Sequence, residues 1–108
     1  QVKCSGLTMV MKREKWENND TDALVKAFLS MRDSREMKAF LRDLLTESEL
    51  IECGKRFHAA RSIAKSIHYD AIREDTGLST RTIARVKKWY KHGRSGYRLA
   101  IRRWKHQL

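Results

Sequence analysis

Residues 69–91 decide the fold, and they read YDAIREDTGLSTRTIARVKKWYK. By the spacing of its apolar residues, the segment divides into a short helix over about 70–75, a turn, and a second helix that begins at Thr80. Gly77 tolerates positive φ, which the tight connection of a helix-turn-helix requires. The sequence therefore predicts a helix-turn-helix over about 69–91. Its small shared core consists of Ile72, Leu78, Ile83 and Val86.

The second helix of this motif separates apolar from basic side chains. Ser79 precedes it as a good N-cap, because its hydroxyl can accept from the amide of the second or third helical residue. Ile83, Val86 and Tyr90 fall within about 60° of one another on a helical projection. The opposite arc carries three cations: Arg81, Arg85 and Lys88. The helix is therefore predicted to bury an aliphatic stripe and to present a basic one.

The charge of the chain is concentrated at its C-terminal end. Residues 1–75 hold 14 Lys and Arg against 13 Asp and Glu, whereas residues 76–108 hold ten Lys and Arg and no acid. A nearly neutral body with a strongly basic end is typical of a protein that binds a polyanion. With no proline and five glycines among 108 residues, the composition favours an all-α fold over a β-rich one.

Four further helices are predicted from the 3.6-residue period. One runs over about 21–32, capped by Asp20 or Thr21, and a second over about 35–45, capped by Ser34. A third begins with a capping box of Thr46 and Glu49 and continues to about residue 66, and the last spans 97–108. The apolar stripe of the first is Leu24, Val25, Phe28 and Leu29. We expect residues 1–19 to be a flexible or extended segment and residues 20–108 to be a single helical DNA-binding domain.

The helix over 46–66 carries a row of small and apolar residues spaced 3, 4, 3, 4 and 3 apart. The row consists of Leu50, Cys53, Phe57, Ala60, Ala64 and Ile67. Core packing and a dimer seam explain this spacing equally well. In either case we expect Cys53 to be a small core residue rather than a reactive thiol.

Other function classes find little support in the sequence. The four histidines share no metal-ligand spacing, and no phosphate-cradling loop or nucleophile elbow occurs. We therefore expect neither an enzyme nor a metal site. Two cysteines make no disulfide framework, and no apolar run reaches the 18 residues of a membrane span. We expect a cytoplasmic protein without membrane partners.

The partner that best fits these features is duplex DNA. The residues predicted to contact bases or phosphates are Arg73, Ser79, Thr80, Arg81, Thr82, Arg85, Lys87, Lys88, Lys91 and Arg94. Arg and Thr at the start of a recognition helix can reach base edges in the major groove. Two alternatives remain open at this point. One is non-specific nucleic-acid binding, and the other is a protein-interaction module whose surface consists of Trp89, Tyr90, Tyr97 and Trp104.

An ordered set of motifs also carries a resemblance: LLTESE at 44–49, Arg56, TGLSTRTIAR at 76–85, and Gly93 followed by YRL at 97–99. Over roughly residues 21–104, the chain resembles the Trp repressor superfamily and, within it, the bacterial Trp-repressor-related proteins of the YerC/YecD type. The resemblance implies an all-α fold of about six helices and an intertwined homodimer built from the N-terminal helices. It also implies that the dimer binds DNA with a pair of helix-turn-helix units and acts as a transcriptional regulator, most simply a repressor.

The resemblance further implies an effector pocket, because the repressor holds tryptophan between its third helix and its recognition helix. The matching positions here are Thr46, Arg56, Thr82 and Arg85. Val86 and Trp89 stand where that family has a glycine and a serine. A branched side chain in place of glycine removes the flat space that an indole needs, and Trp89 could fill such a space from within. We therefore expect no tryptophan cofactor, while the pocket leaves room for another small effector.

Overall fold

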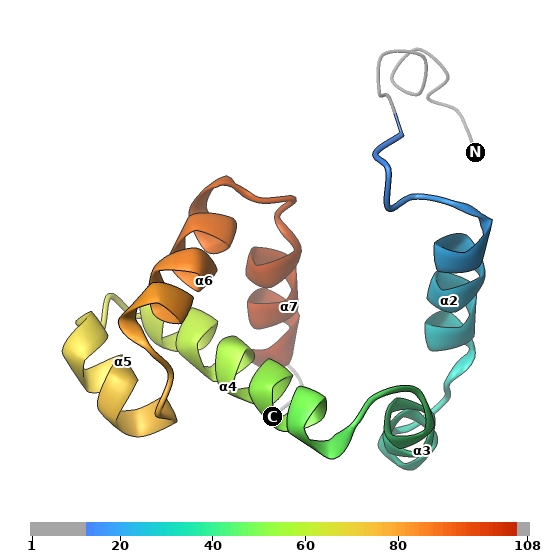
Figure 1. The fold of residues 1–108 in the computed structure, drawn as a ribbon, viewed down its shortest axis with the longest axis horizontal. Coiled ribbons are helices and arrows are strands. Elements are labelled where there is room, and N and C mark those ends of the chain that lie inside the picture. The colour runs from blue at the N-terminus through green and yellow to red at the C-terminus, as the bar shows by residue number, and fades with distance from the viewer. Residues whose placement is uncertain (1–12, 106–108) are drawn as a thin grey trace. The chain divides into compact units, whose positions relative to one another are not determined.

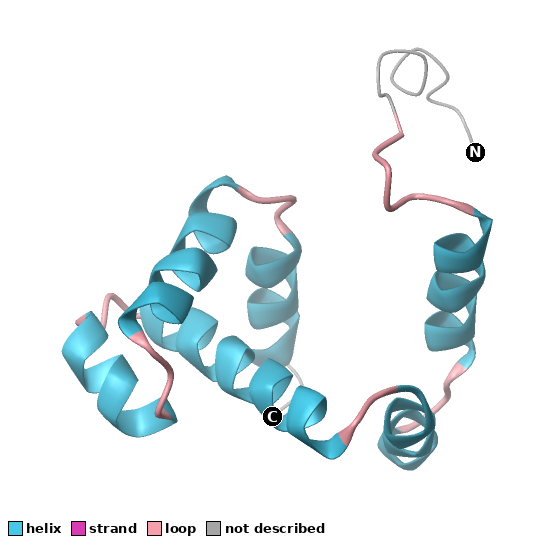
Figure 2. Ribbon diagram, viewed as in Figure 1, coloured by secondary structure: helices cyan, strands magenta, loops and turns pink. Residues whose placement is uncertain are grey.

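The computed structural model describes residues 13–105, and it contains helices but no strand in that part of the chain (Figures 1 and 2). The helices are α2 (Asn19–Ser30), α3 (Ser34–Leu44), α4 (Glu47–Ala64), α5 (Tyr69–Thr76), α6 (Thr80–His92) and α7 (Gly96–Lys105). The all-α prediction is confirmed. Most of the expected N-terminal segment, and the last three residues of the expected final helix, lie outside the described residues.

The first of two compact units ends at Asp43 and contains α2 and almost all of α3. The rings of Phe28 and Phe40 join these helices edge to face, with 5.4 Å between their centroids. No residue of α2 or α3 is buried in the described chain. Val25 is 50% exposed and Leu29 is 80% exposed. The apolar stripe predicted for the first helix is therefore present but largely uncovered.

Both helices of this unit begin at a cap other than the predicted one. Asn18 Oδ1 accepts from the Thr21 amide at 2.9 Å, and the Thr21 hydroxyl accepts from the Asn18 amide at 2.9 Å. At the start of α3, Asp33 Oδ1 accepts from the amide three residues later at 2.9 Å. The predicted caps Asp20, Thr21 and Ser34 are wrong, because an earlier Asn or Asp side chain already satisfies the free amides.

The second unit is built on α4, against which α5, α6 and α7 pack (Figure 1). The predicted capping box of Thr46 and Glu49 begins α4. Seven apolar residues form the buried core of the unit: Ala59, Ala60, Ile72, Leu78, Ile83, Val86 and Ile101. The predicted core of the helix-turn-helix is thus confirmed. Because Ala59 and Ala60 are small and fully buried, they allow the backbone of α4 to lie close to the motif.

The row of small and apolar residues on α4 divides into two parts. Ala60 is buried, and Phe57 and Ala64 pack against the core. Cys53 and Ile67, by contrast, are exposed. The predicted core role of Cys53 is wrong within the single chain, because Cys53 precedes the stretch of α4 whose residues are buried.

An arginine joins α7 to α4. The guanidinium carbon of Arg61 lies 4.5 Å from the centroid of the Trp104 ring and 5.3 Å from that of Phe57. Such contacts between a cation and an aromatic face are attractive because of the ring quadrupole. Together with the buried Ile101, they hold the last described helix against the unit that carries the helix-turn-helix.

Candidate nucleic-acid interface

A positive-φ glycine and a buried threonine fix the turn between α5 and α6. Gly77 has φ 75° and donates its N–H to the Arg73 carbonyl at 2.8 Å. The Thr76 hydroxyl donates to the Ile72 carbonyl at 2.7 Å and accepts from the Leu78 amide at 3.1 Å. The buried Thr76 is therefore satisfied, and Leu78 closes the turn as predicted.

The N-terminus of α6 is capped and lined with hydroxyl groups. Ser79 Oγ accepts from the Thr82 amide at 3.1 Å and lies 3.1 Å from the Thr82 hydroxyl. Arg73 Nη1 donates to Thr80 Oγ1 at 3.4 Å. Ser79 and Thr80 are exposed and Thr82 is half-buried. The first turn of α6 holds no acidic residue. This helix end is accordingly open to a phosphate or a base edge.

The exposed side of α6 is basic, as predicted. We call Arg81, Arg85 and Lys88 the outer face of α6; all three are exposed. Ile83 and Val86, on the opposite side, are 2% and 3% exposed. Since no acidic residue occurs after residue 75, nothing on α6 or α7 offsets the positive charge of the outer face.

The remaining predicted contact residues do not share this face. Lys87 and Lys91 are displaced from its centre by roughly a quarter to a third of a helical turn. They line a cavity on one flank of α6. Arg73 is exposed on α5, and Arg94 is exposed between α6 and α7. Arg73, Lys87, Lys91 and Arg94 therefore lie off the outer face of α6, whereas Arg85 lies on it.

One arginine that supports α6 was not predicted from the sequence. Arg98 Nε donates to the Tyr90 carbonyl at 3.0 Å, and Arg98 Nη2 donates to the Lys91 carbonyl at 3.0 Å. Arg98 therefore caps the C-terminus of α6 from α7. A signal was available, because a cation soon after a helix end is a suitable donor to the last free carbonyls.

The aromatic surface of the interaction-module alternative is not assembled. Of its four members only Trp89 is largely exposed, at 58%. Tyr90 and Tyr97 pack against the core, and Trp104 is half-buried beside Arg61. Most of this aromatic area serves to hold the unit together.

Three of the four predicted effector-pocket residues come together. Arg56, Thr82 and Arg85 line a cavity of about 210 Å³, whose other walls are Val86, Trp89 and Tyr97. Thr46 is not among the lining residues, and its hydroxyl and amide are hydrogen-bonded to Glu49 in the capping box of α4. Three of the four positions thus line one cavity and Thr46 does not, and the role of these residues in binding an effector stays a prediction.

The chemistry of this Arg56–Arg85 cavity is mixed. Arg56 Nε lies 3.5 Å from a Glu52 carboxylate oxygen. Burial raises the pKa of the Tyr97 phenol, and the nearby Arg56 charge partly opposes that rise. Trp89 forms one wall and contacts Gly93, where an added Cβ would lie 2.6 Å from the Trp89 ring. The cavity that remains beside Trp89 is thus lined by two arginines, one of which is paired with Glu52.

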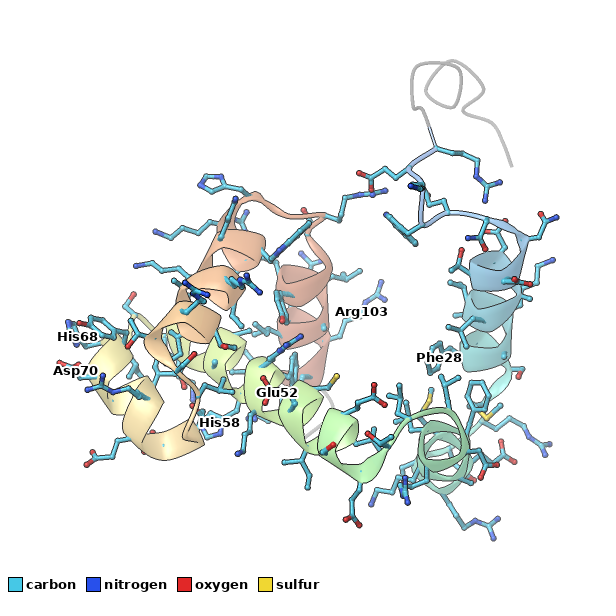
Figure 3. All side chains as sticks on the ribbon, in the orientation of Figure 1. Phe28, Glu52, His58, His68, Asp70 and Arg103 are labelled. Carbon is cyan, nitrogen blue, oxygen red and sulfur yellow. The ribbon has the colours of Figure 1, made fainter. Side chains whose placement is uncertain are left out.

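The start of α5 holds a histidine and an aspartate without forming a metal site (Figure 3). His68 Nδ1 accepts from the Asp70 amide at 3.2 Å and lies 3.5 Å from the Asp70 carboxylate, so this pair caps the helix. Among residues 13–105, no group of three or more His, Cys, Asp or Glu is placed to hold a metal ion. Every helix in this part of the chain is too short or too polar to traverse a lipid bilayer.

The architecture and the helix-turn-helix define an all-α protein with a Trp-repressor-like fold, and the family model of the Trp repressor protein matches residues 19–105. The chain belongs to the Trp repressor family, as a Trp-repressor-related protein of the YerC type. This membership places it among helix-turn-helix DNA-binding regulators rather than enzymes.

Individual relatives agree with that assignment. The uncharacterized protein YerC of Bacillus subtilis is 34% identical over 93 residues, which are 86% of this chain and 89% of that protein. A TrpR-like protein from Eubacterium eligens is 32% identical with a TM-score of 0.81, covering 84% of this chain and 94% of its own. A crystal structure described as a putative Trp repressor, from Staphylococcus aureus, is 30% identical with a TM-score of 0.81, covering 88% and 95%.

Proposed function

We propose that the protein is a homodimeric, sequence-specific transcriptional regulator of the bacterial cytoplasm that represses by occupying duplex DNA. The observation that carries the proposal is the geometry of α6. Its outer face is fully basic and exposed, while its opposite side is locked into the core by Ile83 and Val86. A rigid basic helix with a free N-terminus matches the docking geometry of a recognition helix in the major groove.

Residues in the first turns of α6 contact the bases. Thr80 and Arg81 are exposed beside the Ser79 cap, and Arg81 can pair bidentately with a guanine. Thr82 is half-buried and its hydroxyl lies near Ser79, so it contributes only at the edge of the contact. Lys88, one turn beyond Arg85, reaches bases or the adjacent backbone.

Phosphate contacts are assigned to Arg85 of the outer face and to the cations that surround this face. The candidates are Arg73, Arg85, Lys87, Lys91 and Arg94, with Ser79 as a hydroxyl donor. If six or more phosphates are neutralised across a dimer, the log–log dependence of affinity on salt has a slope of about −5 or steeper.

The dimer is proposed because both compact units leave large apolar side chains uncovered. Val25 and Leu29 on α2 are 50% and 80% exposed, and Leu44 and Ile51 are 43% and 55% exposed. Val25 and Leu29 lie one turn apart on α2, and a contiguous exposed apolar patch is typical of a protein–protein contact. A second copy of this chain is the simplest occupant, since paired recognition helices would then read paired half-sites.

Tryptophan is proposed not to be required for DNA binding. The buried Val86 and the ring of Trp89 both line the cavity that holds Arg56 and Arg85, so a flat indole would have to displace one of them. A smaller anionic effector fits the two guanidinium groups better. The affinity for DNA should therefore be the same with and without added tryptophan.

A selection from random duplexes with the purified protein tests the function directly. Enrichment of a palindrome whose half-sites are about one helical turn apart would support a dimeric sequence reader. Binding to all duplexes with equal affinity would instead assign the chain to non-specific nucleic-acid binding. If the protein binds no duplex but still binds a protein partner at high salt, the chain would instead be a protein-interaction module.

A further inference from the structure

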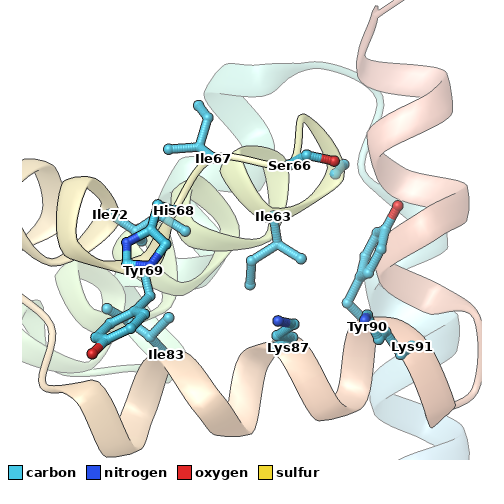
Figure 4. A pocket seen from close by; sticks show the side chains of 11 residues that line it. Ile63, Ser66, Ile67, His68, Tyr69, Ile72, Ile83, Lys87, Tyr90 and Lys91 are labelled. Atoms are coloured by element: carbon cyan, nitrogen blue, oxygen red, sulfur yellow. The ribbon is translucent and has the colours of Figure 1, made fainter.

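A second and larger cavity lies on the other flank of α6 (Figure 4). It has a volume of about 530 Å³ and lies between the α4–α5 connection and α6. It shares no lining residue with the Arg56–Arg85 cavity. Its size is in the range of pockets that take small organic molecules. We call it the Lys87–Lys91 cavity.

Most residues that line the Lys87–Lys91 cavity are aliphatic or aromatic, and Ser66 and the two lysines are its polar members. The aliphatic residues are Ile63, Ala64, Ile67, Ile72 and Ile83. Figure 4 shows the ring of Tyr90 on one side and His68 with Tyr69 on the other, with Ile63 and Lys87 between them. The His68 and Tyr69 rings lie 4.7 Å apart and are mutually tilted by 34°. These surfaces suit a branched aliphatic or aromatic group.

Two cations on one edge give the cavity its polarity. Lys87 and Lys91 stand one turn apart on α6, and no carboxylate lines the cavity. Neither ammonium group forms an ion pair within residues 13–105. The acid nearest in sequence to the lining residues, Asp70, is held against Arg73 at 3.6 Å and against His68. Because like charges one turn apart repel each other, an anion between the lysines would relieve that repulsion.

We propose that the Lys87–Lys91 cavity binds a small organic carboxylate. The carboxylate lies between the two ammonium groups, and its aromatic or branched apolar group lies against the isoleucines and the tyrosine rings. An apolar floor with cations at its edge is complementary to a ligand that is itself both apolar and anionic, because the floor covers the apolar group while the cations fix its orientation.

The proposal also predicts regulation, and this part rests on the proposed function. Lys87 and Lys91 are candidates for phosphate contact, so a carboxylate bound between them removes positive charge that DNA would use. Binding linkage is reciprocal: a ligand that weakens DNA binding is itself bound more weakly in the presence of DNA. The carboxylate therefore acts as an inducer, which releases the protein from its site.

The first experiment detects the ligand without DNA. The ¹⁵N amide spectrum of the full-length protein is titrated with phenylacetate, and with acetate as a probe that lacks the apolar group. The expected result is saturable shifts at residues 66–69 and around residues 87 and 91, with acetate at least about tenfold weaker. The double variant Lys87→Gln/Lys91→Gln should lose about tenfold in phenylacetate affinity. Lys88→Gln, on the outer face, should leave that affinity unchanged.

Three outcomes of this titration overturn the proposal: no saturable shift with phenylacetate, shifts confined to the Arg56–Arg85 cavity, or equal binding by the double variant. Circular dichroism of each variant checks that the helices are intact. The substituted side chains are exposed, so the fold is expected to tolerate the change.

The second experiment measures DNA affinity at constant ionic strength, with phenylacetate exchanged for acetate. Phenylacetate should weaken wild-type binding by about fivefold or more, and it should have no further effect on the double variant. Unchanged wild-type affinity in saturating phenylacetate would overturn the regulatory part. If the protein fails to bind any duplex, the proposed function fails, while the first experiment still decides whether the cavity binds a carboxylate.

Discussion

The two compact units both contain amphipathic helices, but they differ in whether the apolar stripes of these helices are buried within the chain. In the unit from Leu44 onward, α5 and α6 bury their apolar stripes against α4, and Ile72 and Ile83 are 1% and 2% exposed. In the unit up to Asp43, α2 also has an apolar stripe, yet it contains no buried residue. One unit buries its own core within the chain, and the other leaves its apolar face uncovered.

An apolar stripe predicts which face of a helix is buried, but it does not predict what buries that face. The 3.6-residue period shows which face of a helix avoids water. It does not show whether the covering surface comes from the same chain. Leu29, at 80% exposed, and Ile83 occupy similar positions in their sequence patterns. Their energetic roles should differ, and each of the following changes is designed to break or sharpen that contrast.

The largest expected effect is on the core of the unit that carries the helix-turn-helix. Ile72→Ala should lower the free energy of unfolding by about 2–5 kcal/mol, because it removes buried methyl groups and leaves a cavity. Urea denaturation measures the change. Glu74→Ala, on the exposed side of the same helix, is the matched control and should stay within about 0.5 kcal/mol. Equal costs for the two variants would mean that α5 does not share a core with α4 and α6.

A substitution on α2 should act on assembly rather than on the fold of the chain. Leu29→Ser should weaken dimerisation by about 1.5–3 kcal/mol per buried leucine, or more than tenfold in dissociation constant. Sedimentation equilibrium measures the change, and Lys26→Ala on the exposed side of α2 should leave it unaltered. A wild-type protein that is monomeric at high concentration would contradict the contrast between the two units.

A side chain added at Gly77 should destabilise the turn of the helix-turn-helix through the backbone φ angle rather than through steric crowding. Gly77→Ala should cost about 1–2 kcal/mol in unfolding free energy, because φ 75° is strained for a residue with Cβ. An added Cβ there would meet only Lys55 Nζ at 3.9 Å, so crowding does not contribute. Gly96→Ala, where a Cβ has open space and φ is not positive, should be neutral or stabilising. Equal unfolding free energies for Gly77→Ala and the wild type would mean that the motif does not depend on a left-handed residue at this turn.

The smallest effect concerns the cap of α4. Hydrogen bonds from the Thr46 amide and hydroxyl lower the pKa of Glu49. A carboxyl whose pKa is lower in the folded state stabilises the protein above its unfolded pKa, and that contribution is lost as the pH falls through the folded pKa. The wild type should therefore lose slightly more thermal stability between pH 7 and pH 3 than Glu49→Gln, whose amide keeps the capping box without titrating. Parallel melting curves for both proteins would show that the carboxylate adds nothing.

Much of the helix-turn-helix was predictable because its determinants are local. Gly77, the Ser79 cap and the opposed stripes of α6 lie within a few residues of one another, so helix periodicity and capping preferences are sufficient. The errors arose where the outcome depends on competition or on distance. Asn18 and Asp33 precede other good caps, and a pattern alone cannot rank them. Cys53 falls in a regular apolar row, but whether α4 is covered there depends on packing that the row does not encode.

The sequence predicted that the site would be basic, but it did not predict where each basic side chain would lie. Composition indicated a basic end, yet it could not show that Lys87 and Lys91 turn from the outer face toward a cavity. Nor could it show that Arg98 caps α6 instead of joining the interface. These assignments depend on where α7 and the α4–α5 connection lie beside α6, which are tertiary facts. Nor could the sequence show that Thr46, which is hydrogen-bonded to Glu49 in the capping box, does not line the cavity of Arg56 and Arg85.

If the outer face of α6 reads duplex DNA, the loss of one of its cations should change both the affinity and the base preference of the protein. Arg81→Ala is compared with the wild type on the selected duplex and on its single-base variants. We predict a loss of about 1–3 kcal/mol on the selected site and a relaxed preference at one base pair. Unchanged affinity together with unchanged preference at every position would contradict the account.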